Sequence, residues 1–173
     1  MKELLYIVGQ ILGGVAVVLG FLAFQRKTQL GIIIFQLITA LTFSFHYFFI
    51  HAFTAVALNL LSAAICVCFG ILNKQKRDNR VETIVSVLLI ILAGTLAWEN
   101  IYSLFLIAGL VVNAVSLSFS NPQTTRMAML VKSPLCLIYN VAFASLGGII
   151  FECTVLVSAI IGLINNRNKG ELS

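Results

Sequence analysis

Two charged side chains, Lys132 and Glu152, lie inside long apolar stretches of this sequence. A charge at the centre of a bilayer costs roughly 2.5–3.5 kcal/mol on insertion scales. A carboxylate there must therefore meet water, a partner or a ligand. For Lys132 the sequence leaves two possibilities open. The long side chain could extend to the membrane surface, or it could pair with a polar group inside the protein. For Glu152 it leaves open a role in a polar pathway or a position at the outer boundary.

Asn59 lies in another apolar stretch, 93 residues before Glu152. Polar residues at matching positions of two repeats would face each other across a central axis, where substrate sites lie in repeat-built transporters. An interhelical hydrogen bond, worth about 0.6–2 kcal/mol, would also account for them. The pathway reading places both residues at one central cavity. The further residues expected near it are Lys132, Asn113, Tyr47 and Tyr139.

The expected depth of these groups argues against a close ion pair. Counting the rise per residue puts Lys132 in the inner half and Glu152 in the outer half of the membrane, about 12 Å apart. We therefore expect both to face the cavity without a tight salt bridge. His46 and His51 fall near the outer end of one apolar stretch and are expected at the membrane interface.

Other chemistry is not indicated by the sequence. We find no Ser-His-Asp set, no phosphate-binding glycine loop and no His-rich metal cluster, so no catalytic residue, metal or cofactor is expected. The four cysteines are interpreted as small apolar packing residues. They are Cys66, Cys68, Cys136 and Cys153.

The elements that must position these residues are strongly apolar. Hydrophobic residues make up 60% of the chain and charged residues 10%, against about 45–50% and about 25% in soluble domains. Seven apolar runs follow one another, near the length of a membrane-spanning helix. They cover about 4–24, 30–50, 52–72, 84–98, 101–119, 127–146 and 149–164. The sequence thus predicts an all-α membrane protein with seven transmembrane helices.

Basic residues are distributed unevenly between the loops. If the N-terminus lies outside, the inner loops and tail hold nine of the eleven Lys and Arg, whereas Lys2 lies outside and Lys132 within a span. The nine are Arg26, Lys27, Lys74, Lys76, Arg77, Arg80, Arg126, Arg167 and Lys169. Because cytoplasmic loops are enriched in Lys and Arg, the C-terminus is predicted to be cytoplasmic. The expected partner of these charges is the lipid bilayer and not nucleic acid.

Short polar features repeat along the chain. Gly70-Ile-Leu-Asn73 and Gly162-Leu-Ile-Asn165 are 92 residues apart, as are Tyr47 and Tyr139. The polar turn at 24–29 is followed about 94 residues later by a similar turn at 119–123. This order predicts two parallel three-helix repeats joined by a linker helix. The repeats cover 1–73 and 101–173, with a short cytoplasmic tail, and 74–100 holds a basic cytoplasmic loop and the linker.

The layout and the turn Asn121-Pro122-Gln123 resemble the PQ-loop superfamily, which includes the SWEET and SemiSWEET sugar transporters. More closely, and over nearly its full length, the chain resembles small bacterial inner-membrane proteins of the YgjV type. The first repeat has Thr28-Gln29 where the motif has Pro-Gln. The resemblance implies an inner-membrane location and an architecture, without naming a substrate.

Two function classes follow. The first is a transporter of a small polar solute, working by alternating access with its pocket between the three-helix units. The second is a non-transporting scaffold, receptor or accessory subunit, favoured if Asn59 and Glu152 are consumed in helix–helix bonds. Gly9 and Gly13 form a small-xxx-small pair, which predicts close helix packing within the bundle or across a homo-oligomer interface.

Overall fold

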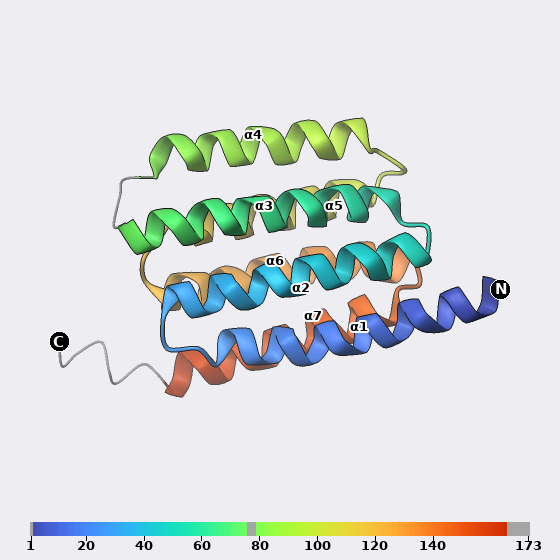
Figure 1. The fold of residues 1–173 in the computed structure, drawn as a ribbon, viewed down its shortest axis with the longest axis horizontal. Coiled ribbons are helices and arrows are strands. Elements are labelled where there is room, and N and C mark those ends of the chain that lie inside the picture. The colour runs from blue at the N-terminus through green and yellow to red at the C-terminus, as the bar shows by residue number, and fades with distance from the viewer. Residues whose placement is uncertain (1, 76–78, 166–173) are drawn as a thin grey trace.

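The structure, a computed structural model, describes residues 2–75 and 79–165, with side chains from residue 7 onward. Over these ranges the chain forms seven α-helices and no strand, which confirms the all-α class (Figure 1). The helices are α1 (Lys2–Phe24), α2 (Gln29–Phe49), α3 (Phe53–Gln75), α4 (Arg80–Leu96), α5 (Ser103–Leu117), α6 (Pro122–Ala142) and α7 (Leu146–Asn165).

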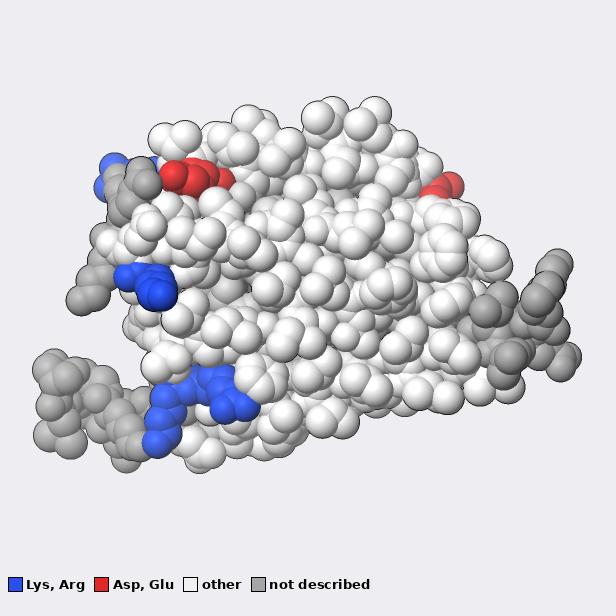
Figure 2. Space-filling model, viewed as in Figure 1, with Lys and Arg blue, Asp and Glu red and all other residues white. Residues whose placement is uncertain are grey.

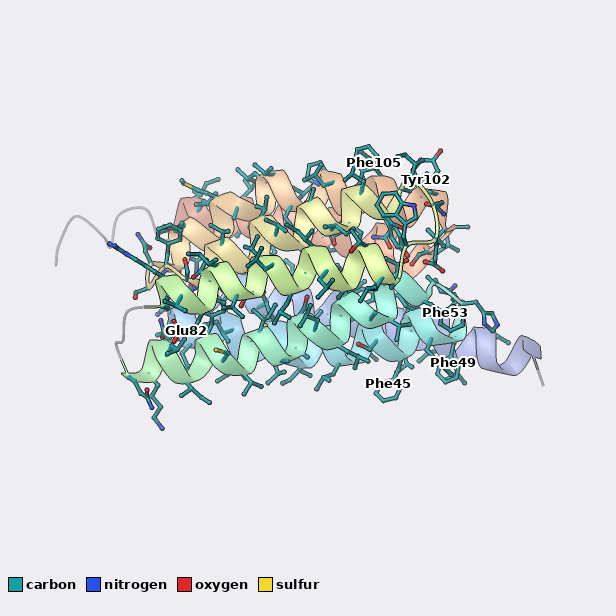
Figure 3. All side chains as sticks on the ribbon, turned by 90° about the horizontal axis from the view of Figure 1, so that it is seen from above. Phe45, Phe49, Phe53, Glu82, Tyr102 and Phe105 are labelled. Atoms are coloured by element: carbon teal, nitrogen blue, oxygen red, sulfur yellow. The ribbon has the colours of Figure 1, made fainter. Side chains whose placement is uncertain are left out.

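The helices form two layers with one helix at the edge. Helices α1, α2 and α3 make one layer, and α7, α6 and α5 make the other (Figure 1). The layers meet where α1 packs on α7 and α3 packs on α5, so segments from opposite ends of the chain lie side by side. Helix α4 lies at one edge of the bundle and packs against α3 and α5 (Figure 1). The view from above in Figure 3 shows it between these two helices.

The outer surface of the bundle is apolar. Large apolar side chains such as Ile11, Phe45 and Leu88 are more than half exposed, as expected for side chains that meet lipid tails. In the described part of the chain, four helices are long and apolar enough to cross a membrane, namely α1, α2, α3 and α7. Helices α4 and α5 are shorter, with 17 and 15 residues, and α6 carries Arg126 and Lys132. That all seven helices span the membrane stays a prediction.

Basic side chains gather at one end of the bundle, and an uncharged belt separates them from the other end (Figure 2). Arg26 and Lys27 lie in the α1–α2 connection, Lys74 lies in the last turn of α3 and Arg80 begins α4. We call this end of the bundle the basic end. The prediction placed Lys76, Arg77, Arg167 and Lys169 there too, but these lie outside the described residues.

Both turns of the predicted motif are helix N-caps. The Thr28 hydroxyl accepts a hydrogen bond from the backbone N–H of Gly31 at 3.1 Å. The Asn121 side chain accepts one from the N–H of Gln123 at 2.9 Å. Such caps satisfy N–H groups that a helix start leaves unpaired, and Pro122 occupies a first-turn position where its missing N–H is harmless. The turns therefore start α2 and α6 at the basic end.

The small residues of α1 pack inside the bundle. A Cβ atom added to Gly13 would lie 3.0 Å from the Cα atom of Gly147 on α7, and one added to Gly9 would lie 3.0 Å from the Cβ atom of Phe49 on α2. The predicted close packing of this pair therefore occurs between helices of one chain.

Candidate functional site

A cavity of about 70 Å³ lies between the two layers, lined by every helix except α4. Along the bundle the cavity lies near the middle of α6, because the lining residue Lys132 is the central residue of Pro122–Ala142. Apolar side chains such as Leu110, Phe151 and Val155 form much of the wall. The polar part of the lining consists of Gln36, Thr39, Tyr47, Asn59, Ser62, Asn113, Lys132 and Glu152. Five of the six predicted pathway residues thus lie at one cavity, and Tyr139 lies outside its lining.

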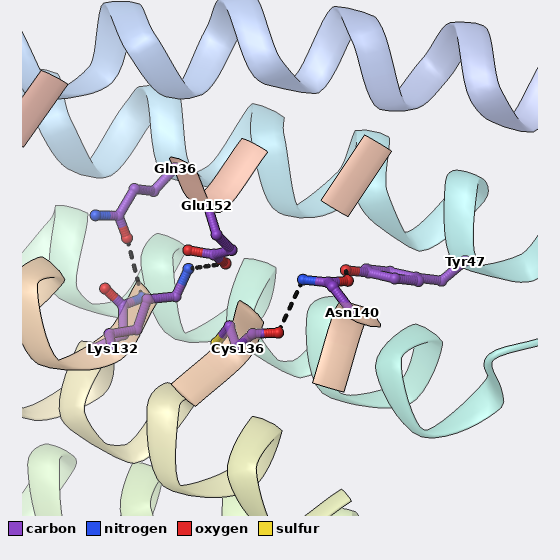
Figure 4. A network of polar contacts seen from close by, with 7 residues as sticks. Gln36, Tyr47, Lys132, Cys136, Asn140 and Glu152 are labelled. Carbon is purple, nitrogen blue, oxygen red and sulfur yellow. Dashed lines mark hydrogen bonds and ion pairs between the residues drawn. The ribbon is translucent and has the colours of Figure 1, made fainter. Parts of the chain in front are cut away.

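The cavity contains a buried ion pair (Figure 4). Lys132 Nζ lies 2.7 Å from Glu152 Oε1, and the two residues are 8% and 3% exposed. The expectation that they do not form a tight salt bridge was wrong. The prediction ended α6 too late, at 146 and not 142, and began α7 too late, at 149 and not 146. In the structure, Lys132 lies ten residues from the outer end of α6, and Glu152 lies six residues from the outer end of α7. The difference in depth is therefore four residues. That offset is about 6 Å at 1.5 Å per residue, which the lysine stem bridges.

Three polar atoms of the wall lack partners. Asn113 Nδ2 donates to Gln36 Oε1 at 3.1 Å. Among the described residues, Gln36 Nε2, Asn113 Oδ1 and Glu152 Oε2 are buried and have no hydrogen-bond partner. A buried group left unsatisfied costs about 1–3 kcal/mol. The wall therefore holds one donor and two acceptors whose hydrogen-bonding capacity is unused.

Asn59 lines the cavity, and its hydrogen bond is made within its own helix. Its Nδ2 atom donates to the backbone oxygen of Ala55 on the same helix, at 2.8 Å. Thr39 likewise donates to Phe35 O on its own helix, at 2.7 Å. The structure thus brings Asn59 and Glu152 to one cavity, as predicted, and the recorded hydrogen bonds of Asn59 are local to α3.

The two predicted tyrosines have different surroundings. Tyr47 donates to Asn140 Oδ1 at 2.6 Å, and Asn140 in turn donates to Cys136 O at 3.0 Å (Figure 4). Tyr139 is fully buried and donates to Glu99 Oε2 at 3.4 Å. The Glu99 carboxylate also accepts from the first two backbone N–H groups of α3, each at 3.1 Å. Tyr139 therefore fastens the connection between α4 and α5, beyond the cavity.

His46 lies in the last turn of α2, near the end expected to be the outer one, but its side chain is buried between helices and does not face the surface. Its ring is fully covered, with Nδ1 2.8 Å from Gly9 O and Nε2 2.9 Å from Ser145 Oγ. A carbonyl oxygen only accepts, so in the neutral ring Nδ1 carries the proton and Nε2 accepts from the Ser145 hydroxyl. His46 thereby ties α2 to α1 and to the α6–α7 turn. His51 is exposed.

The basic end is closed by buried hydrogen bonds. Arg126 is 1% exposed and donates through Nε to Phe24 O at 3.0 Å and through Nη2 to Arg26 O, so it satisfies carbonyls at the end of α1. Its Nη1 atom donates to Gln123 Oε1 at 2.8 Å. Arg126 was predicted to be an inner-loop charge, but it is a buried residue in the first turns of α6. Two glutamines cross the same region, with Gln29 donating to Thr125 at 2.9 Å and Gln25 donating to Ser158 Oγ at 2.8 Å.

The lining follows a single spacing. Six pairs of lining residues are 93 positions apart, the separation of the bonded pair Tyr47 and Asn140. The pairs are Gly20/Asn113, Gln36/Met129, Thr39/Lys132, Phe43/Cys136, Asn59/Glu152 and Ser62/Val155. The sequence comparison used spacings of 92 and 94 at the tyrosines and the polar turns. A uniform spacing of 93 is the signal that would have selected Thr39 and Cys136.

Comparison with known proteins addresses the class of the chain. Residues 7–169 match the family model Imp-YgjV, which is described as a bacterial inner membrane protein. No curated protein matches the chain. No solved structure matches it. The match covers nearly the whole length and agrees with the apolar helices and their apolar outer surface, so the chain belongs to the YgjV-type family of bacterial inner membrane proteins.

Proposed function

We propose that the protein transports a small polar solute by alternating access, with the central cavity as the solute site. The observation that carries this proposal is the composition of the cavity wall. It holds a buried ion pair and three partnerless polar atoms midway along the bundle, in a wall that is otherwise largely apolar. Ionisable groups inside a membrane are rare and usually mark a substrate or ion path.

The backbone of two turns supports the repeat that this mechanism requires. His51 and Ala144 have φ angles of 61° and 48° and stand in the α2–α3 and α6–α7 turns, with the same spacing as Tyr47 and Asn140. The backbone bonds around them also correspond. Ile50 N–His46 O matches Phe143 N–Tyr139 O, and Ala52 N–Tyr47 O matches Ser145 N–Asn140 O. We infer a repeat that relates α1–α3 to α5–α7, with α4 as linker.

A parallel repeat of this kind places the solute site between the two units. The pairings of α1 with α7 and of α3 with α5 are those that a twofold axis along the bundle would produce. The same layout supports the resemblance to the PQ-loop superfamily. If α1–α3 and α5–α7 did not superpose by a rotation about this axis, the inferred repeat would fail.

The proposed orientation has the N-terminus outside and the C-terminus in the cytoplasm. It rests on the basic end, because Lys and Arg are retained on the cytoplasmic side. A reporter fused after Ser173 is expected to be active in its cytoplasmic form and inactive in its periplasmic form. The paired reporter after Glu99, in the α4–α5 connection, should give the opposite result. Periplasmic activity after Ser173 would overturn the orientation.

Solute uptake into proteoliposomes tests the transport proposal. In a screen of small polar solutes, at least one should enter faster than into protein-free vesicles. Glu152→Gln and Asn59→Ala are each expected to slow that uptake about tenfold or more, equivalent to 1.4 kcal/mol, because they alter the polar wall. The matched control is Cys153→Ala, next to Glu152 on α7 but exposed on the outer surface.

Two outcomes of this experiment count against the proposal in different ways. If no solute enters above the protein-free rate, the transporter class is wrong and a scaffold, receptor or accessory subunit takes its place. If uptake is found but is unchanged in both cavity variants, the solute site lies elsewhere.

A further inference from the structure

We infer that the cavity selects solutes that are small, carry no charged group and both donate and accept hydrogen bonds, which is the chemistry of a primary amide or a vicinal diol. This inference deepens the proposed function and rests on the cavity as solute site. Three features of the wall carry it: its charge balance, its free hydrogen-bonding atoms and its volume.

The charges at the cavity balance each other. Lys132 and Glu152 are the only Lys, Arg, Asp or Glu residues in the described lining, and they are already paired at 2.7 Å. A solute with a net charge would add an uncompensated charge to a buried, water-poor site, which is strongly unfavourable. A zwitterion could pair its own charges with the wall only by separating Lys132 from Glu152. The balanced wall therefore favours a solute without charged groups.

The free atoms of the wall define the complementary ligand. Gln36 Nε2 is a donor without an acceptor, and Asn113 Oδ1 and Glu152 Oε2 are acceptors without donors. A matching solute supplies one acceptor and two donors, as the carbonyl and NH₂ group of an amide do. Neighbouring atoms cover these three groups in the present conformation, so the solute reaches them by rotation of the side chains. One hydrogen bond joins Gln36 to Asn113, so little is lost when the amides turn.

The volume sets an upper limit on size. The cavity measures about 70 Å³, less than half of the roughly 150 Å³ of an engineered cavity that holds benzene. A solute of this size is smaller than a six-membered ring. The cavity volume therefore favours short amides and diols over a hexose.

Ligand-detected NMR with isosteric probes tests the inference on the full-length protein in deuterated detergent. Saturation transfer to the methyl group is expected for acetamide, and ethylene glycol should reduce it by competition. Acetate has the same shape with a negative charge, acetone lacks the donors, and glycine is a zwitterion. None of these three should show transfer above the level seen with an unrelated membrane protein.

Variants locate the binding. Gln36→Leu and Asn113→Leu each remove a free polar atom with little change in volume, and each should reduce the acetamide signal severalfold. Gln10→Leu is the matched control, because Gln10 Nε2 is also buried without a partner but lies outside the cavity lining. The two cavity variants are independent, so misfolding of one leaves the other as the test.

The failure of this inference is distinguishable from the failure of transport. Acetate or acetone signals equal to that of acetamide, or an acetamide signal unchanged in the folded cavity variants, would overturn the selectivity inferred here. Acetamide binding that is lost in the cavity variants, without uptake of any neutral solute into proteoliposomes, would retain the binding site and overturn the transport proposal.

Discussion

Replacing Lys132 by Met should lower the free energy of unfolding by about 3–5 kcal/mol, because it leaves the buried Glu152 carboxylate without its partner. Glu152→Leu should have an effect of similar size, because it leaves the buried Lys132 ammonium without its partner. The double variant Lys132→Met/Glu152→Leu should recover most of the loss, because apolar residues of similar volume often replace a buried ion pair without a net penalty. Reversible unfolding in mixed micelles measures all three.

The control for these three variants is a substitution at the residue next to Lys132, on the outer surface of the same helix. Val131 is 55% exposed on the outer surface of α6, and Val131→Met should change stability by less than about 0.5 kcal/mol. If the losses of the two single variants simply add in the double variant, the charges do not stabilise each other and the central role given to the pair is wrong.

The crossing of α1 and α7 is the second position where a large effect is expected. Gly13→Ala should destabilise the protein by about 1–3 kcal/mol, because the new methyl group would lie 3.0 Å from Gly147 Cα and 3.2 Å from the His46 ring. Gly14→Ala should be neutral or stabilising by up to about 1 kcal/mol, because nothing lies within 4 Å and alanine favours a helix. Unfolding midpoints of the two neighbouring variants give the comparison directly.

A second measurement separates packing from helix propensity. The His46 ring nitrogens should show changed NMR shifts in Gly13→Ala and unchanged shifts in Gly14→Ala, since only the first methyl group meets the ring. Equal stability of the two variants would show that α1 and α7 separate at no cost, contrary to the close contact described above.

The number of helices and their order could be predicted from the sequence because apolar runs report membrane-like segments directly. The start of α6 could not. Its first turns contain Arg126, which was taken as a loop charge because its hydrogen-bond partners other than Gln123 are not local. They are the carbonyl oxygens of Phe24 and Arg26, about a hundred residues away in the sequence. A buried arginine can be told from an exposed one only when these long-range partners are known.

The cavity, too, could be predicted only in part from the sequence. Asn59, Glu152, Lys132, Asn113 and Tyr47 could be predicted to lie at one cavity because polar residues in apolar helices have few other places to go. The pairing of Lys132 with Glu152 depended on the axial register of α6 and α7, which was displaced by errors of a few residues at the outer ends of these helices. The burial of His46 depended on Gly9 O and Ser145, whose positions follow from the packing of three elements.

The Lys132–Glu152 pair lies on α6 and α7, wholly within one of the two three-helix units proposed above. A relative rotation of the two units would carry both charges along as one dipole and would not separate them. The hydrogen bonds that join the two units include Tyr47 to Asn140 and His46 to Ser145 toward one end, and Arg126 to Phe24 O and Gln29 to Thr125 at the basic end. At the cavity itself, Gln36 and Asn113 join them as well. The barrier to that motion is thus set by the hydrogen bonds between the units, and the Lys132–Glu152 ion pair is not broken by it.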